Sequence, residues 1–210
     1  MPAARPETPG PARSGGGGTY QPPRARTGTP TILTPKAPTV TLTRVQSGVG
    51  VLTFEAVCSE AVGDLRLGCA YELRSGQSSI VQHASGVSTA PTNSRRPVIK
   101  GERDRFERLT LDLMQSRDVE RLVIYAFSQS AAALTWGGTL VARTFGQALI
   151  EIPLDRAPSQ DVYVLMSLYN IRGEFVLRAE MEQISGSVHD ACTAYGFNRI
   201  TWLDHRTPVT

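Results

Sequence analysis

Long apolar runs, cysteine and charge are all scarce in this chain of 210 residues. No apolar run approaches the roughly 18 residues that a membrane-spanning helix needs, and the best run, 122–127, suits a buried strand. No hydrophobic stretch follows Arg5, so we expect no signal peptide. The cysteines Cys58, Cys69 and Cys192 are odd in number and not closely paired, which argues against a disulfide framework. We therefore predict a cytoplasmic protein in a reducing compartment, without a transmembrane segment.

The small net charge of +3 is unevenly spread along the chain. Residues 1–38 contain five Arg and Lys residues and one Glu, a charge of +4, which leaves about −1 for the remainder. The same residues hold nine of the fourteen prolines and the run 15–18 of four glycines. Such a segment buries too little to offset the entropy lost on ordering. We predict a disordered, Pro/Gly-rich basic tail over 1–38, which acts as a tether, and one folded domain over 39–210.

The basic residues of the tail could contact nucleic acid or anionic lipid, but their spacing favours neither. They are spread over more than thirty positions, and Tyr20 is the only aromatic residue among them. Nucleic-acid binding depends on clustered positive charge. We therefore expect no nucleic-acid partner and interpret the tail as a spacer or as an arm that recruits other proteins.

From residue 39 onward, apolar and polar residues alternate with the period of half-buried strands. The alternation is clear in 65–73 and again in 175–181, whereas 121–127 and 162–168 are apolar on both faces and should lie in the middle of a sheet. Glycine- and proline-containing turns separate these segments. The pattern predicts an all-β fold, a two-layer antiparallel β-sandwich of about ten strands.

One segment near the C-terminus has the pattern of a short helix instead. Ser187 can cap the first turn, Asp190 lies favourably near the positive end of the helix, and Gly196 can end it. We expect this helix to lead into a last strand over 199–203.

Four motifs occur in an order that resembles the TerD/TerA tellurium-resistance family, in its TerA-like branch. They are the strand Asp-Leu-Arg-Leu-Gly from Asp64, the segment Pro-Val-Ile-Lys-Gly-Glu-Arg-Asp-Arg over 97–105, Trp136 before the strand 150–155, and Ala-Tyr-Gly-Phe-Asn-Arg-Ile-Thr-Trp over 194–202. The resemblance covers about 39–206. It implies a β-sandwich in a stress-response system that assembles with related proteins.

The resemblance also implies calcium bound by acidic loops at one end of the sandwich. Asp64, Glu102 and Asp104 match acids of the family and are the candidate metal ligands, but Arg66 and Arg105 stand where further aspartates are expected. Calcium prefers six to eight oxygen ligands, and arginine beside such a site repels the ion and pairs with the carboxylates. We expect degenerate loops without a cofactor, and weak calcium binding is the alternative.

Other chemistry has weaker support in the residues. No nucleophile elbow, phosphate loop or Cys-Xaa-Xaa-Cys pair occurs, and His83, His189 and His205 lie far apart, so we do not expect an enzyme. A hydrolase would need one of these histidines beside a serine and an acid. Trp136 and Trp202 either close the ends of the core or form a platform for a ligand. The cysteines are expected to be buried apolar fillers, with direct tellurium or redox chemistry as the alternative.

These observations predict a non-enzymatic binding and assembly module of the tellurium-resistance type, whose partners are related proteins. One alternative is a calcium-binding module of the same fold whose assembly is controlled by the ion. The second is a β-sandwich that binds carbohydrate or lipid. Peripheral association with a membrane stays open in each case.

Overall fold

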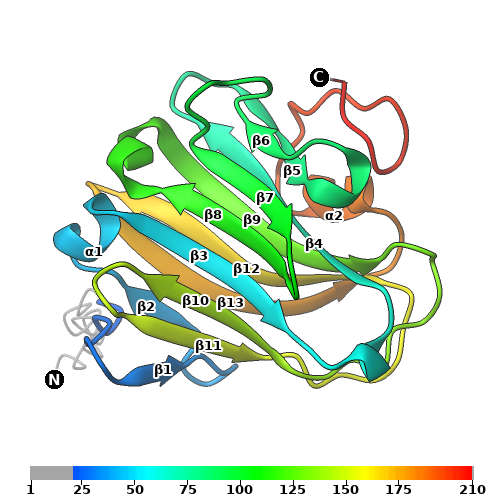
Figure 1. The fold of residues 1–210 in the computed structure, drawn as a ribbon, viewed down its shortest axis with the longest axis horizontal. Coiled ribbons are helices and arrows are strands. Elements are labelled where there is room, and N and C mark those ends of the chain that lie inside the picture. The colour runs from blue at the N-terminus through cyan, green and yellow to red at the C-terminus, as the bar shows by residue number, and fades with distance from the viewer. Residues whose placement is uncertain (1–20, 210) are drawn as a thin grey trace, which may run out of the picture.

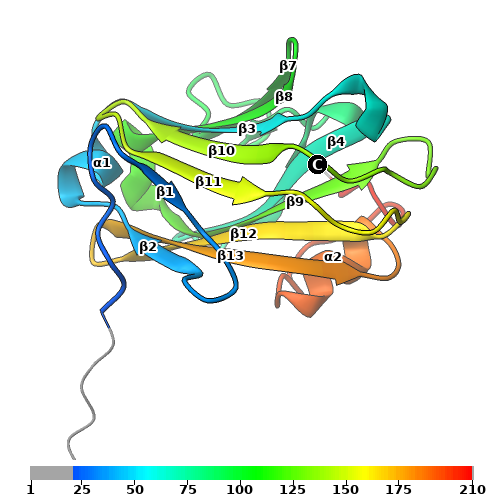
Figure 2. The same cartoon turned by 90° about the horizontal axis from the view of Figure 1, so that it is seen from below.

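Two sheets face each other across a layer of apolar side chains in the computed structural model, which describes residues 21–209 (Figures 1 and 2). All strand pairs are antiparallel among the described strands, except that β1 and β11 run parallel. The predicted two-layer, all-β sandwich is confirmed. Part of the predicted disordered tail, 1–20, lies outside the described residues.

The elements follow the predicted organisation, with more strands than expected. The seven-stranded sheet contains, in spatial order, β1 (Pro30–Ile32), β11 (Leu149–Pro153), β10 (Thr139–Thr144), β3 (Val51–Val57), β8 (Glu107–Asp112), β7 (Ile99–Arg103) and β6 (Thr89–Ala90). The six-stranded sheet contains β2 (Thr39–Thr41), β13 (Glu174–Ile184), β12 (Val162–Ile171), β9 (Val119–Ser128), β4 (Leu65–Leu73) and β5 (Ser78–Gln82). The helices are α1 (Arg44–Gly48), α2 (Val188–Ala194) and the 3-10 helices η1 (Glu60–Val62), η2 (His83–Ser85) and η3 (Leu113–Asp118).

The alternating strands place their apolar side chains between the sheets. In β4 the side chains of Leu67, Cys69 and Tyr71 all lie in this inter-sheet core, each at most 1% exposed. In β13 the alternate residues Phe175 and Leu177 do the same. Period-two burial of this kind fixes which face of each strand is turned inward, and the one-sided burial predicted from the alternation is confirmed.

A second apolar core covers the outer face of the six-stranded sheet. Tyr125 and Phe127 from β9 pack there with Val164 from β12 and with Val188 and Cys192 from α2. The two strands are neighbours in the middle of the sheet, between β13 and β4. They are apolar on both faces because one face meets the other sheet and the other face meets α2 and the chain that follows it (Figure 2).

Helix α2 begins and ends as the sequence predicts. The Ser187 hydroxyl accepts a hydrogen bond from the Asp190 N–H, and the Asp190 carboxylate accepts one from the Ser187 N–H, which makes a capping box. Gly196 follows the helix with a φ of +75°, a conformation that glycine adopts without strain.

The strand predicted over 199–203 is wrong. This segment makes only one isolated bridge, between Trp202 and Pro208. The chain turns back on itself there, with the Leu203 N–H donating to the Thr207 carbonyl at 2.8 Å. Ile200 is buried against the second core. The apolar residues of 199–203 therefore cover the outer face of the six-stranded sheet and do not add a strand to it.

The predicted boundary at Pro38 is also wrong for residues 21–38. Strand β1 pairs in parallel with β11, and the Leu33 N–H donates to the Glu151 carbonyl at 2.9 Å. Leu33 is 1% exposed and Ala25 is 6% exposed, so both belong to the inter-sheet core. Two well-placed apolar side chains anchor this segment although its mean composition resembles that of a linker.

Candidate functional site

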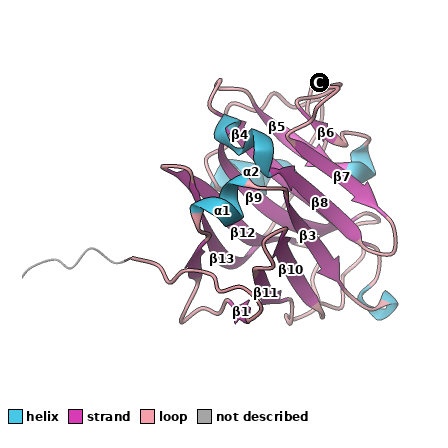
Figure 3. Cartoon of the chain, turned by 60° about the vertical axis from the view of Figure 1, so that its left-hand side comes forward, coloured by secondary structure: helices cyan, strands magenta, loops and turns pink. Residues whose placement is uncertain are grey.

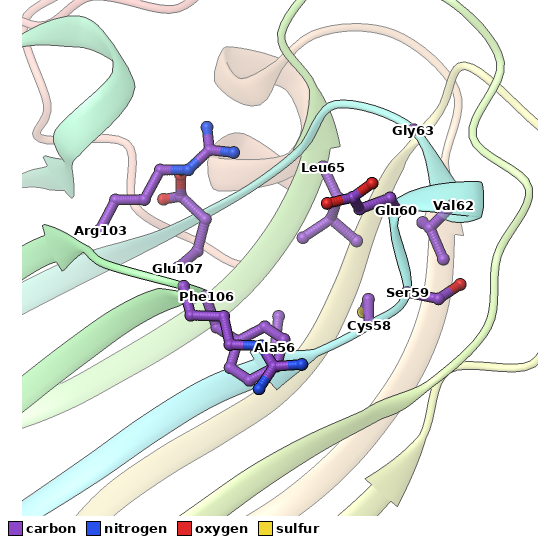
Figure 4. A pocket seen from close by; sticks show the side chains of 11 residues that line it. Ala56, Cys58, Ser59, Glu60, Val62, Gly63, Leu65, Arg103, Phe106 and Glu107 are labelled. Carbon is purple, nitrogen blue, oxygen red and sulfur yellow. The ribbon is translucent and has the colours of Figure 1, made fainter.

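One end of the sandwich carries the loops in which the candidate ligands were predicted. A pocket of about 100 Å³ lies there between the β3–β4 connection, which contains η1, and the β7–β8 turn (Figure 4). Cys58, Glu60, Arg103 and Glu107 are among the side chains that line it. The β3–β4 connection leads into the motif at Asp64, the β7–β8 turn belongs to the motif over 97–105, and the fold brings these two segments together.

Glu107 is the most buried charged group of this end. Its side chain is 5% exposed, and its Oε1 lies 3.7 Å from both Arg66 Nε and Arg103 Nε. Burial raises the pKa of Glu107, while Arg66, the Leu67 N–H, Arg103 and His83 oppose the rise. Oε1 itself accepts no hydrogen bond. The carboxylate is thus held between two guanidinium groups and is only partly compensated for its loss of water.

A second charge cluster crosses the outer face of the seven-stranded sheet. Arg108 lies opposite Glu55 on one side and Glu102 on the other in the strand register. Arg108 Nε donates to Glu55 Oε1 at 2.5 Å, and Arg108 Nη1 lies 3.6 Å from Glu102 Oε1. Lys100 Nζ lies 2.7 Å from Glu102 Oε2. The hydrogen bond from Lys100, helped by Arg108, lowers the pKa of Glu102 against a smaller effect of burial.

Asp64 has a different role, as a hydrogen-bond acceptor for the end of β9. Its carboxylate accepts from Ser128 Oγ at 2.7 Å and from the Ser130 N–H at 2.6 Å. Burial raises the pKa of Asp64, but the hydrogen bonds from these two serines, together with Arg66, outweigh it and hold the pKa below its ordinary value. Asp64 therefore ties the β3–β4 connection to the β9–β10 loop.

The candidate ligands Asp64, Glu102 and Asp104 do not form one site. Asp104 is exposed in the β7–β8 turn, where its N–H donates to the Phe106 carbonyl at 3.2 Å. Within residues 21–209, no three His, Cys, Asp or Glu side chains come close enough to hold a metal ion. The three acids that match acids of the resembling family therefore lie in separate surroundings in the fold.

The arginines of this end pair with acids in part as predicted. Arg66, Arg103 and Arg108 lie beside carboxylates, whereas Arg105 stacks on the ring of Phe106, with its Cζ 5.2 Å from the ring centroid. The partner of Arg66 is Glu107, which was not among the candidate residues. The alternation of β8 contained the signal, because Glu107 shares the buried face of Leu109 and Leu111.

The remaining candidates are placed in the two cores. Trp136 is 5% exposed, packs edge-on against Tyr163 with 5.1 Å between ring centroids, and donates to Ser159 Oγ, so it closes the inter-sheet core. Trp202 is half-buried against the second core. The His189 N–H donates to the His205 carbonyl, so these two residues come together.

All three cysteines are free thiols. Cys69 and Cys192 are buried, and Cys58 is half-buried at the pocket. Burial raises the pKa of Cys58 to about 11 and those of Cys69 and Cys192 to about 12. High thiol pKa values disfavour the reactive thiolate, which favours the interpretation of these side chains as apolar fillers.

No protein-family model matches the chain, and no curated protein matches it either. The likeness to the tellurium-resistance family is thus carried by the four sequence motifs.

Proposed function

We propose that the chain is a non-enzymatic binding and assembly module of the tellurium-resistance type, whose loop end is organised by its own arginines in place of calcium. The observation that supports this most is the position of Glu107, buried between Arg66 and Arg103. Arg66 stands where the resembling family has an aspartate. The substitution adds a cation where a ligand was expected, and the structure gives that cation a carboxylate partner.

The electrostatics of the loop end oppose a divalent ion. Calcium is bound by several anionic oxygens at 2.3–2.6 Å. Here Glu107 faces two guanidinium groups, Glu102 faces Lys100 and Arg108, and the oxygens of Asp64 are used by serine donors. An arriving ion would have to displace these partners and lie within the field of the arginines.

The surface offered to protein partners is the outer face of the seven-stranded sheet. Helix α2 covers the other sheet, and neither α1 nor α2 lies over this one (Figure 2). Glu55, Lys100, Glu102 and Arg108 form a cross-strand charge network on it. Charged groups of both signs at fixed positions favour a partner with the complementary pattern.

Calorimetric titration with calcium tests the loop end. We expect no binding heat at micromolar calcium and no change in melting temperature. Binding heat that disappears in Asp64→Asn would contradict the proposal and would favour the calcium-controlled alternative.

A pull-down from stressed cells tests the assembly role. Bait protein is expected to recover proteins of the tellurium-resistance type, and Lys100→Glu should weaken the recovery because it breaks the charge network of the outer face. Lys36→Glu, on the segment before β2, is the matched control. Recovery of no such protein, or equal loss with both variants, would overturn the assignment.

A further inference from the structure

The end of the sandwich opposite the charge-paired loops carries exposed apolar side chains. Helix α1, η3, the β10–β11 turn and the β12–β13 turn gather there, at the left of Figure 1 and toward the viewer in Figure 3. We call this end of the sandwich the apolar end. Its exposed apolar residues, with their exposed fractions, are Val45 (67%), Val49 (45%), Met114 (75%), Phe145 (72%) and Ile171 (53%).

Gly50 joins three of these segments. Its carbonyl accepts a hydrogen bond from the Leu113 N–H at 2.9 Å, at the start of η3, and the neighbouring Val51 carbonyl accepts one from the Phe145 N–H at 3.0 Å. A Cβ on Gly50 would lie 2.5 Å from Phe145 Cβ, so the Phe145 side chain covers this glycine. Met114 and Phe145 are therefore fixed on either side of the short link between α1 and β3.

Two hydrogen bonds fix the fourth segment to the same end. Asn170 Nδ2 donates to the Ser116 carbonyl in η3 at 2.9 Å, and the Phe175 N–H donates to Ser47 Oγ in α1 at 3.0 Å. The turn that carries Ile171 lies between Asn170 and Phe175. It is consequently held beside both helices.

An exposed arginine accompanies the apolar residue of each segment. Among residues 21–209 these four form no ion pair; they are Arg44 in α1, Arg117 in η3, Arg143 before the β10–β11 turn and Arg172 in the β12–β13 turn.

The acids near these arginines are fewer. Glu174 pairs with Arg24. Asp112 accepts hydrogen bonds from the Met114 N–H and from Gln115 but keeps its negative charge, and Asp118 is exposed. The four arginines outnumber these two aspartates, so the apolar end is also positively charged.

We infer that the apolar end docks on the surface of an anionic lipid bilayer. Apolar side chains on helix and turn tips can enter the headgroup boundary, while arginines beside them contact lipid phosphates. Both parts of this pattern are present in all four segments. An exposed apolar cluster without unpaired cations would suit a second protein equally well, and the arginines decide in favour of an anionic surface.

The start of the described chain lies at the same end. Gln21 and Pro22 line a groove together with Ile171 and Glu174. The twenty residues before Gln21 contain Arg5 and Arg13 against Glu7. The described chain thus begins beside the apolar end, and the sequence that precedes residue 21 carries net positive charge.

Flotation of the full chain with lipid vesicles tests the inference. Vesicles that mix phosphatidylserine into phosphatidylcholine should carry the protein upward, phosphatidylcholine alone should not, and added salt should weaken the binding. Each arginine near an anionic surface contributes about a fivefold change in partitioning. The double variant Arg44→Gln and Arg117→Gln should therefore bind roughly 25-fold more weakly, and Met114→Ser with Phe145→Ser should also reduce binding.

Matched variants outside the apolar end distinguish binding through this surface from non-specific electrostatic or hydrophobic binding to vesicles. Arg105→Gln with Arg156→Gln removes one exposed and one half-buried arginine outside the apolar end, and Leu203→Ser removes a side chain that is 74% exposed. These controls should bind vesicles as the wild type does. The inference is overturned if phosphatidylserine vesicles do not retain the chain, or if the controls lose as much binding as the test variants. It is also overturned if the test variants abolish self-association or peptide binding and leave vesicle binding unchanged. The inferred membrane docking does not depend on the proposed assembly role, which is tested on the outer face of the seven-stranded sheet.

Discussion

Removal of Arg66 should expose the balance of forces around Glu107. We consider Arg66→Met, which keeps most of the apolar stem of the side chain and deletes its charge. Glu107 would then retain one cationic neighbour, Arg103, whose side chain is 46% exposed and screened by solvent, whereas that of Arg66 is 18% exposed. The carboxylate would stay buried with less compensation.

The magnitude follows from distance and burial. Two unit charges 3.7 Å apart attract by roughly 4 kcal/mol at an effective dielectric constant of about 20. Breaking a fully buried pair costs about 3–5 kcal/mol because a charge is left uncompensated. Since Arg66 is partly exposed and Arg103 remains, we expect the free energy of unfolding to fall by about 2 kcal/mol at neutral pH.

The loss should depend on pH in a definite direction. The pKa of Glu107 lies above its ordinary value because of burial, so its contribution to stability is full below the ordinary pKa and declines as pH rises through the folded-state pKa. Arg66→Met raises that pKa further. The deficit of the variant should therefore be smaller at about pH 5 than at about pH 7, because the lower pH favours the protonated carboxyl of Glu107.

Urea unfolding at both pH values measures this directly. Glu107→Gln in the Arg66→Met background should restore most of the lost stability, because it removes the buried charge and keeps the shape. A deficit that is equal at both pH values and is not rescued by glutamine would refute the reasoning. It would show that Arg66 acts through packing of its stem and not through charge.

Three further outcomes follow from the structure. Asp64→Ala should lower the free energy of unfolding by about 1–2 kcal/mol at neutral pH. Because the pKa of Asp64 is held low, that contribution is present above the ordinary pKa and should be lost as pH falls through the folded-state pKa in acid-unfolding curves. Gly68→Ala would place a Cβ 2.7 Å from the Tyr125 ring, and thermal unfolding should show a loss of stability of about 2 kcal/mol. The control is Gly28→Ala, whose Cβ would meet no heavy atom within 4 Å but whose φ is +76°. It should lose only the backbone penalty of about 1 kcal/mol. Cys58, with a pKa of about 11, should be alkylated by iodoacetamide about a hundredfold more slowly than an ordinary cysteine, and wild-type speed equal to that of free cysteine would contradict this.

The strands were predictable because their burial is periodic. The alternation in 65–73 and 175–181 indicates strands that bury one face. The segments 121–127 and 162–168 are apolar at nearly every position, which indicates strands that bury both faces. Helix α2 was predictable from its capping box. Helix α1 carried the same kind of signal, since Thr43 and Gln46 form a capping box at its start, but five residues are too few for a helical period to appear.

The errors at the two ends of the domain have a common cause. Segment 21–38 is held by Leu33 and by a parallel pair with a strand more than a hundred residues away, and 199–203 is held by burial of Ile200. Local composition and turn chemistry do not record such distant contacts. A few anchoring side chains decide the structure of these segments, and averages over the segments hide them.

The site shows a similar limit. Motif order indicated correctly that the 64–66 and 102–108 segments carry the charges of one end, but it could not show which charges meet. Strand register settles that question: Glu107 is turned inward beside Leu109, and Arg108 is turned outward toward Glu55. A shift of one residue in β8 would have exchanged the two roles.

The two ends of the sandwich differ in how their arginines are used, and this difference bears on function. At the loop end, Arg66 and Arg108 are neutralised by carboxylates that the fold itself supplies, so their attraction contributes to the folded state and leaves little field for a ligand. At the apolar end, Arg44 and Arg117 have no such partner within the described chain, and their charges lie beside exposed apolar side chains. Unpaired like charges weaken a fold slightly, and this cost is offset only when an anionic surface is bound. The same residue type therefore serves stability at one end and recognition at the other.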